Sequence, residues 1–293
     1  MKNKKIFALG FFDGVHLGHG MVLDLCQHLA EDAGAETAAI TFDRHPQSLF
    51  TPNPPPLLNT TNDRRWLIQT WASIDHLFVF QVNEQVMGLA WQDFLENLIH
   101  EGAVGFVCGY DFRFGRNGEG TAEKLAAFAQ ERNMPCYIVQ EQTLDGEKIS
   151  STRIRKLIEQ GDIVNAERLL GHFHMFTGKV VHGQHLGRTL GVPTANLQLP
   201  DDLVKPAFGV YACSACVDGN FYVAVTNVGT RPTVNGQGVT VEPWILDFDG
   251  DLYGKEITLY FRKFLRPEQK FDSLEALKTQ IQKDAAEAKQ FLR

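Results

Sequence analysis

The order of the predicted secondary structure is the feature that most restricts the fold. Short apolar runs alternate with helical patterns up to about residue 140. The predicted strands are residues 6–9, 37–42, 76–80, 104–108 and 136–139, and the predicted helices are residues 19–33, 63–73, 91–101 and 122–132. This alternation is typical of βαβ units, which build a parallel sheet covered by helices on both faces. A Rossmann-like α/β domain is therefore predicted, with ligands at the carboxyl ends of its strands.

The pattern changes after residue 150. Two short helices are predicted first, and β-rich runs separated by glycine turns follow. The helices are residues 152–160 and 163–170, and the strands are residues 176–181, 209–217, 221–228, 239–248 and 256–264. Strands at this spacing predict an antiparallel barrel of about six strands. A capped helix is predicted over residues 273–292, and the predicted domains are residues 1–172 and 173–293.

Composition narrows the function classes. A chain of 293 residues with 44% hydrophobic residues is typical of a soluble globular protein of two domains. Its net charge of −7 argues against a large nucleic-acid surface, which is usually basic. The five cysteines are odd in number, which favours reduced thiols in the cytoplasm, and the pair Cys213 and Cys216 is interpreted as structural. The amino-terminal apolar run is too short for a signal peptide or a membrane span.

Residues 10–19, GFFDGVHLGH, follow the first predicted strand and lead into the first predicted helix. Glycines let a backbone approach an anion closely, and a helix start offers unpaired N–H groups. His16 and His19 are three residues apart, so they should share one face, where they could donate hydrogen bonds and, when protonated, supply charge. The alternative is a glycine-rich turn with two exposed histidines. A metal site is disfavoured, because no carboxylate lies at a suitable spacing.

Three further segments follow predicted strands or open a helix. They are residues 41–46, TFDRHP; residues 108–120, CGYDFRFGRNGEG; and residues 149–155, ISSTRIR. The last places two hydroxyls at a helix start before Arg153 and Arg155, which suits phosphate, although alone it would be an ordinary cap with solvated arginines. Residues 51–58, TPNPPPLL, are predicted to form an extended surface loop. Several anion-binding turns at one sheet edge predict a nucleotide site.

Together these motifs resemble the bacterial bifunctional riboflavin kinase/FMN adenylyltransferase family, the FAD synthetases. The second half supports the resemblance through residues 183–196, GQHLGRTLGVPTAN; residues 227–233, NVGTRPT; Glu242 in VEPWILDF; and the helical tail. The resemblance covers nearly the whole chain. It implies an enzyme that transfers phosphoryl and nucleotidyl groups, with riboflavin, FMN and ATP as small-molecule substrates, Mg²⁺ as cofactor, and no nucleic acid, membrane or obligate protein partner.

For the first domain, the resemblance implies that the FMN phosphate attacks the α-phosphorus of ATP. The nucleophile is already an anion, so positioning and charge stabilisation suffice. The implied catalytic residues are His16, His19, Ser151, Thr152 and Arg153, and the implied nucleotide-binding residues are Gly10, Phe11, Asp13, Gly14, Gly109, Asp111 and Arg155. Alternatively, Asp13 only fixes the conformation of the turn and does not bind the nucleotide.

For the second domain, the resemblance implies transfer of the ATP γ-phosphoryl group to the ribityl hydroxyl of riboflavin. Glu242 is the implied base, because an alcohol is a poor nucleophile at neutral pH. The implied Mg²⁺ ligands are Thr194 and Asn196, of which Asn196 also counts as catalytic and Thr194 also binds the nucleotide. Gly183 and Arg188 are implied to line the ATP phosphates. No GxxxxGK[ST] motif is present, which excludes a P-loop kinase.

The chain departs from the family pattern at two places. Asp43 and Arg44 stand where a glutamate and a proline are usual, and Trp244 stands where a histidine is usual. The first change could alter flavin or adenine affinity, and the second should alter one strand face. Two alternative functions are also compatible with parts of the sequence. One is a single adenylyltransferase for another phosphorylated precursor with a flavin-binding barrel, and the other is a nucleic-acid-binding protein with a degenerate synthetase-like domain.

Overall fold

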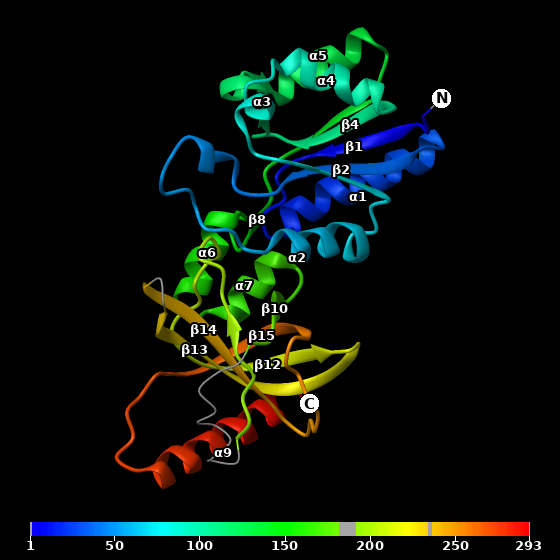
Figure 1. Ribbon diagram of the computed structural model, residues 1–293. Coiled ribbons are helices and arrows are strands. Elements are labelled where there is room, and N and C mark those ends of the chain that lie inside the picture. The colour runs from blue at the N-terminus through cyan, green and yellow to red at the C-terminus, as the bar shows by residue number, and fades with distance from the viewer. Residues whose placement is uncertain (1, 182–191, 234–235, 293) are drawn as a thin grey trace. The chain divides into compact units, whose positions relative to one another are not determined.

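The computed structural model describes residues 2–181, 192–233 and 236–292 (Figure 1). Residue contacts group the chain into two compact units. The first unit comprises Met1–Leu57 and Thr61–Ser151, and the second comprises Leu58–Thr60 and Thr152–Arg293. The predicted boundary at residues 172 and 173 lies further along the chain than this division, and it stays a prediction.

A parallel sheet of five strands forms the centre of the first unit. Its order is β3-β2-β1-β4-β7, and every pair in it is parallel. The strands are β1 (Lys5–Leu9), β2 (Glu36–Phe42), β3 (His76–Phe80), β4 (Ala103–Gly109) and β7 (Cys136–Val139). The strand order reverses between β1 and β4, the position at which such sheets bind ligands. The predicted Rossmann-like sheet is confirmed.

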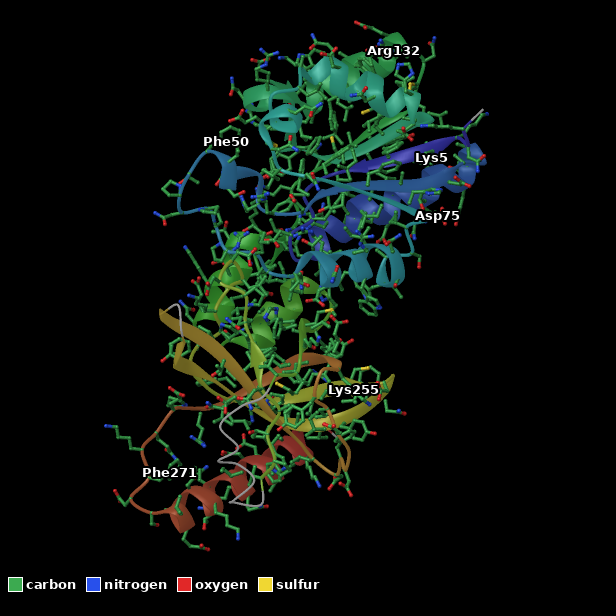
Figure 2. The ribbon with its side chains drawn as sticks, in the orientation of Figure 1. Lys5, Phe50, Asp75, Arg132, Lys255 and Phe271 are labelled. Carbon is green, nitrogen blue, oxygen red and sulfur yellow. The ribbon has the colours of Figure 1, made fainter. Side chains whose placement is uncertain are left out.

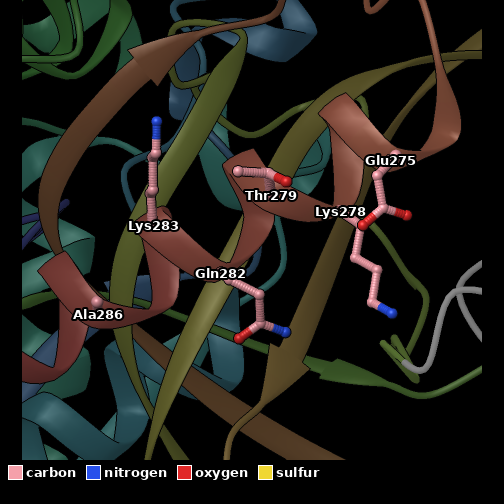
Figure 3. A pocket seen from close by; sticks show the side chains of 6 residues that line it. All are labelled: Glu275, Lys278, Thr279, Gln282, Lys283 and Ala286. Atoms are coloured by element: carbon pink, nitrogen blue, oxygen red, sulfur yellow. The ribbon is translucent and has the colours of Figure 1, made fainter.

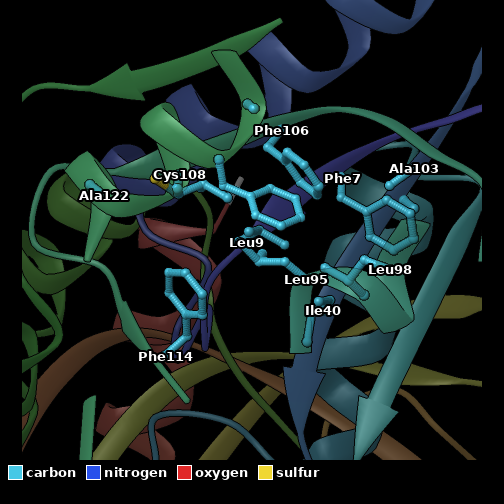
Figure 4. Packing of buried hydrophobic residues seen from close by; sticks show 14 residues of the cluster. Phe7, Leu9, Ile40, Leu95, Leu98, Ala103, Phe106, Cys108, Phe114 and Ala122 are labelled. Atoms are coloured by element: carbon cyan, nitrogen blue, oxygen red, sulfur yellow. The ribbon is translucent and has the colours of Figure 1, made fainter. Parts of the chain in front are cut away.

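Helices cover both faces of this sheet. The helices are α1 (Leu17–Ala33), α2 (Thr61–Trp66), α3 (Glu84–Met87), α4 (Trp91–His100) and α5 (Ala122–Glu131). The short elements are η1 (Pro46–Leu49), η2 (Leu67–Trp71), η3 (Arg116–Gly118), β5 (Arg113–Phe114), β6 (Gly120–Thr121), β8 (Thr143–Leu144) and β9 (Glu147–Lys148). Figure 1 shows α4 and α5 on one face and α1 on the other. The α4 and α5 face packs its apolar side chains, among them Leu95 and Leu125, against Phe7 and Phe106 of the sheet (Figure 4).

Side-chain hydrogen bonds tie neighbouring strands together at the amino edge of the sheet. The Asp75 carboxylate accepts bonds from the backbone N–H of Thr37, at 2.9 Å, and from its hydroxyl, at 2.8 Å. Lys5 is buried and donates to the Glu101 carbonyl. Figure 2 labels both Asp75 and Lys5. These bonds lie at the edge opposite the carboxyl ends of the strands, so they stabilise the sheet without occupying its ligand-binding edge.

Two sequence predictions for the first unit need correction. The predicted helix over residues 63–73 is α2 followed by a single π-helical turn, η2, which holds one extra residue. The proline-rich segment was predicted to be an extended surface loop, but Leu57 and Leu58 at its end are 3% and 1% exposed. Burial removes their apolar surface from water, so the segment ends in the packed interior.

The second unit is a six-stranded antiparallel barrel with three helices. Its sheet order is β10-β15-β12-β13-β14-β11. The strands are β10 (His174–Lys179), β11 (Leu197–Gln198), β12 (Gly209–Val217), β13 (Asn220–Thr233), β14 (Gly236–Ile245) and β15 (Glu256–Pro267), and the helices are α6 (Ser151–Glu159), α7 (Ile163–Leu170) and α9 (Leu274–Phe291). A bridge from Val181 to Asn196 joins the two ends of the sheet, so the predicted barrel is confirmed.

Helix α9 is fastened to the barrel by both apolar packing and an ion pair. Ala285 and Ala288 pack among Val210, Ala212, Val225 and Leu246. Arg266 of β15 donates to both carboxylate oxygens of Asp284, from Nε at 3.1 Å and from Nη2 at 2.8 Å. Only 4% of the Asp284 side chain is exposed, so this pair is shielded from water.

The outer side of α9 carries a shallow hollow of about 430 Å³ (Figure 3). Its lining residues are Glu275, Lys278, Thr279, Gln282, Lys283 and Ala286. None of them is a predicted site residue, and all six come from one helix. The hollow therefore adds nothing to the candidate sites. A search of the described helices finds no helix long and apolar enough to cross a membrane.

Candidate active sites

The turn between β1 and α1 has a strained backbone. Phe12 and Val15 have φ angles of 57° and 42°, a region that bulky or β-branched side chains rarely adopt. Gly14, with φ at 83°, adopts the same region without a Cβ to clash. Both Phe12 and Val15 are buried, at 1% and 0% exposure. Strain of this kind persists only where the surroundings hold the chain in place, and it gathers at functional sites.

The two histidines of the turn lie against each other, as their spacing predicted. His16 is the N-cap residue of α1, and its Nδ1 accepts a hydrogen bond from the backbone N–H of His19 at 3.3 Å. Their rings are stacked with centroids 3.6 Å apart, and the His19 ring meets the Phe12 ring edge-on. The N-terminus of α1 and both imidazoles thus occupy one small region after β1.

The surroundings of His19 favour the uncharged form of its ring. Its Nδ1 atom is buried and has no hydrogen-bond partner among the described residues. Burial of the ring is the largest of three causes that lower the pKa of His19 well below its ordinary value. The neighbouring His16 and the Arg64 charge are the second and third. The histidines were predicted to donate hydrogen bonds and, when protonated, to supply charge. For His19, desolvation favours donation from the uncharged ring in the ligand-free protein, and its catalytic role stays a prediction.

Arg64 is the site residue that sequence reasoning missed. Its side chain is fully buried, its Nη1 lies 3.9 Å from the Asp13 carboxylate, and its Nη2 donates to the Phe42 carbonyl. The guanidinium also lies over the Phe11 ring, 4.7 Å from the centroid.

A weak sequence signal for Arg64 did exist. Arg64 precedes the buried Leu67 and Ile68 by three and four residues, the spacing of one helix face, whereas its neighbour Arg65 is exposed.

The segment ISSTRIR reaches the turn through its first helical residue. Ser151 begins α6, and its hydroxyl donates to the Asp13 carbonyl at 2.9 Å. The prediction that this segment meets the turn is confirmed for Ser151. Along α6, Thr152 is exposed and Arg155 is buried. The roles given to Thr152, Arg153 and Arg155 stay predictions.

The glycine-rich loop after β4 starts beside the same turn. Leu9 pairs with Cys108, so Gly10, just after β1, and Gly109, the last residue of β4, lie at the ends of neighbouring strands at the switch point. Asp111 is exposed and forms an ion pair with Lys148 at 3.0 Å. Its carboxylate is thus engaged by a cation in this structure, and its nucleotide-binding role stays a prediction.

The first departure from the family pattern stabilises the end of β2. The Asp43 carboxylate accepts a hydrogen bond from the Val82 backbone N–H at 2.9 Å, and Arg44 is exposed. The Asp43 carbonyl also accepts a bond from the Thr61 hydroxyl at 2.7 Å. Asp43 therefore fixes the loop after β3 and the start of α2, next to the turn.

In the second unit, strand pairing brings the predicted kinase residues into one row. Glu242 of β14 pairs with Asn227 of β13. On the other side, Thr194 pairs with Trp244 and Leu197 pairs with Val241, a register that places Asn196 opposite Glu242. Residues opposite each other share one face of a sheet, so Asn196, Glu242 and Asn227 lie side by side on it.

Further polar contacts surround this row. The Thr240 hydroxyl donates to the Glu242 carboxylate at 3.1 Å, and the Asn227 amide lies 3.5 Å from the Glu268 carboxylate. Glu242 and Asn196 are partly exposed, so solvent and small molecules can reach them. Trp244, the second departure, packs against the apolar cluster under α9, and its effect on the strand face relative to the family stays a prediction.

Two predicted residues, Gly183 and Arg188, lie outside the described residues. Among the residues that the structure describes, no group of three or more His, Cys, Asp or Glu side chains could hold a metal ion. The oxygen donors of Thr194 and Asn196 are of the hard type that suits Mg²⁺. A cation held there would take its other ligands from water and phosphate.

Both halves of the chain match known families. Residues 1–153 match the FAD synthetase model, and residues 170–292 match the riboflavin kinase model. The chain is 36% identical to the bifunctional riboflavin kinase/FMN adenylyltransferase of Listeria monocytogenes, over 98% of this chain and 92% of that protein. It belongs to the bifunctional riboflavin kinase/FMN adenylyltransferase family. Members from Bacillus subtilis and Escherichia coli K12 are each 34% identical and are covered to 92%.

Family membership defines the chemistry of the two units. The chain is an enzyme with a riboflavin kinase domain and an FMN adenylyltransferase domain, and its substrates are flavins and ATP. A solved structure from Streptococcus pneumoniae, described as a macrolide-efflux protein, is 30% identical with a TM-score of 0.88, covering 99% of this chain and 95% of that one. The likeness covers nearly the whole length of both chains. The word efflux describes the pneumococcal protein and not this chain.

Proposed function

We propose that this chain phosphorylates riboflavin to FMN with one ATP and then adenylylates FMN to FAD with a second ATP, each reaction using its own unit. The observation that carries the proposal is that each family-matched segment holds a separate polar cluster. His16, His19 and Ser151 belong to the first, and Asn196, Glu242 and Asn227 belong to the second.

Adenylyl transfer breaks the bond between the α- and β-phosphates of ATP. An oxygen of the FMN phosphate attacks the α-phosphorus, and pyrophosphate leaves with the electrons of the broken bond. The helix start at His16 offers N–H groups and a positive dipole to the ATP phosphates. His19 donates a hydrogen bond rather than a charge when the ligand-free enzyme meets ATP, because its pKa is lowered. Catalysis rests on positioning, since the nucleophile is already ionised.

Phosphorylation of riboflavin needs a base, because the ribityl hydroxyl must lose its proton as it attacks the γ-phosphorus. Glu242 is the candidate base, and the Thr240 hydroxyl fixes one of its carboxylate oxygens. ADP leaves with the bonding electrons of the γ-phosphoryl group. Thr194 and Asn196 would hold Mg²⁺, which neutralises charge on the transferring phosphates.

Location and partners form the last part of the proposal. ATP as substrate and five cysteines free of disulfides suit the cytoplasm. We expect the purified chain to complete both reactions without another protein or a nucleic acid. Chromatography of riboflavin, ATP and Mg²⁺ incubated with the purified chain tests this, and FMN should form first and FAD second. Accumulation of neither product would refute the proposed function.

Two substitutions test the assignment of sites. H19A should abolish FAD formation and spare FMN formation, and E242Q should do the reverse. The matched controls are H28A, which removes an exposed histidine of α1, and E256Q, which removes an exposed carboxylate of β15. Initial rates of FMN and FAD formation are measured separately. Equal losses of both activities in either site variant would contradict the separation.

A further inference from the structure

Arg64 is a buried cation that contacts the turn after β1 from a segment that none of the sequence motifs covers. Its exposure is 0%, and it lies on α2, far from the turn in sequence. Its guanidinium meets three parts of the ligand-binding edge at once: the Asp13 carboxylate, the Phe42 carbonyl at the end of β2, and the Phe11 ring. Burying an arginine is costly, so these contacts must compensate for its lost hydration.

The strained turn requires such support. Phe12 and Val15 hold left-handed backbone angles on either side of Asp13 and Gly14. The Thr41 hydroxyl fixes the Phe11 carbonyl at 2.7 Å, and the Ser151 hydroxyl fixes the Asp13 carbonyl at 2.9 Å. Both of these bonds hold the main chain. Arg64 instead holds the Asp13 side chain, so it restrains the turn from a different direction.

We propose that Arg64 is a positioning residue for adenylyl transfer, whose guanidinium holds the Asp13 carboxylate, the Phe42 carbonyl and the Phe11 ring in register. The turn then presents His16 and His19 to the reacting phosphates. This inference rests on the proposed function of the first unit. A lysine would keep the charge but lack the planar fork that reaches a carboxylate and a carbonyl together.

Arg64 also sets the electrostatic environment of His19. The groups that face the His19 ring are His16 from α1, Phe12 from the turn and the Arg64 charge from α2. The Arg64 charge is one of the causes that lower the pKa of His19, after enclosure and His16. Removing that charge should therefore raise this pKa toward its ordinary value. A residue that only filled space would leave it unchanged.

The experiment compares R64M, R64K and the matched control R65M, which removes the exposed neighbouring arginine of the same helix. R64M should lower the kcat of FAD formation about 100-fold, the size of a misplacement of the reacting groups. R64K should lower it about tenfold, equivalent to one lost hydrogen bond. R65M should match the wild type, and all three variants should keep the FMN formation rate, because that reaction belongs to the other unit. Thermal melting of the first unit reports separately whether each variant is folded there.

The second readout needs no turnover. Proton NMR follows the His19 ring during a pH titration, with the resonance assigned by its absence from H19Q. The pKa of His19 should rise in R64M and stay at the wild-type value in R64K and R65M. An unchanged pKa in R64M, or FAD formation by R64M at the R65M rate, overturns the inference.

Two remaining outcomes are also decisive. If the melting curve shows that the first unit of R64M is unfolded, R64K decides the question. Full FAD formation by folded R64K overturns the role of the guanidinium fork, and a selective loss of FAD formation supports it. If the wild type makes FMN but no FAD, the proposed function fails, and the titration alone then tests whether Arg64 acts on His19.

Discussion

The ion pair between Arg266 and Asp284 leads to a quantitative prediction about the second unit. The two side chains are 16% and 4% exposed, and the carboxylate accepts three hydrogen bonds from the guanidinium and one from Gln280 at 2.9 Å. D284A removes the acceptors and leaves the arginine charge without compensation. Breaking a buried pair on one side costs about 3 to 5 kcal/mol of unfolding free energy. Because Arg266 keeps some contact with water, we expect about 3 kcal/mol.

Differential scanning calorimetry measures this loss. For a unit of this size, about 3 kcal/mol lowers the melting temperature by about 10 °C. The drop should affect the barrel transition, since both partners lie in the second unit. Riboflavin phosphorylation should lose heat resistance in parallel, while adenylylation of supplied FMN should not. The reason is that α9 packs against the cluster that contains Trp244, two residues from Glu242.

A matched control lies three residues further along α9. Glu287 pairs with Lys263 at 2.9 Å, but these side chains are 49% and 38% exposed. Such surface pairs contribute at most about 1 kcal/mol, so E287A should change the melting temperature little. The double variant R266M/D284L should regain much of the stability, because no buried charge remains unpaired. Equal melting temperatures for D284A and E287A would refute the reasoning.

Two further predictions concern single side chains of the barrel and the sheet. T240V removes the hydroxyl that orients Glu242 and should lower the kcat of FMN formation about tenfold. Product chromatography measures this loss, and FAD formation from FMN should be unchanged. An unchanged kcat of FMN formation would count against Glu242 as the oriented base. Burial raises the pKa of the Cys26, Cys108 and Cys213 thiols to about 12, so these thiols should react with a thiol reagent at pH 8 only after unfolding. Rapid reaction of more than two of the five thiols in the native chain would contradict this prediction.

The sequence predicted well what depends on local pattern. Apolar runs of four to six residues separated by helical periods identified all five strands of the sheet, because both faces of a parallel strand are buried. The turn after β1 was found through its glycines and its place before a helix. The paired histidines followed from the helical repeat alone, and their stacked rings agree with it.

The parts that escaped prediction depend on tertiary contacts. Arg64 and Arg65 are neighbours of the same type, and only the packed structure shows that one is buried and the other exposed. The lowered pKa of His19 has the same origin, because it arises from burial of the ring in the packed structure rather than from its sequence neighbours alone. The extra residue in the π-helical turn of η2 leaves the apolar periodicity nearly unchanged, so it gave no signal.

The pairing of β13 with β14 also makes the kinase site sensitive to strand alignment during folding. Side chains alternate between the two faces of a strand, so a slip of β14 by one residue would turn Glu242 toward the barrel interior. Val241 or Pro243 would then stand beside Asn227 in its place. A slip of two residues would keep the face but bring Thr240 or Trp244 to that position. The rate of riboflavin phosphorylation therefore reports whether β14 is in the correct register. A barrel with a one-residue register shift could still close, but it would lack the Glu242 carboxylate at the site.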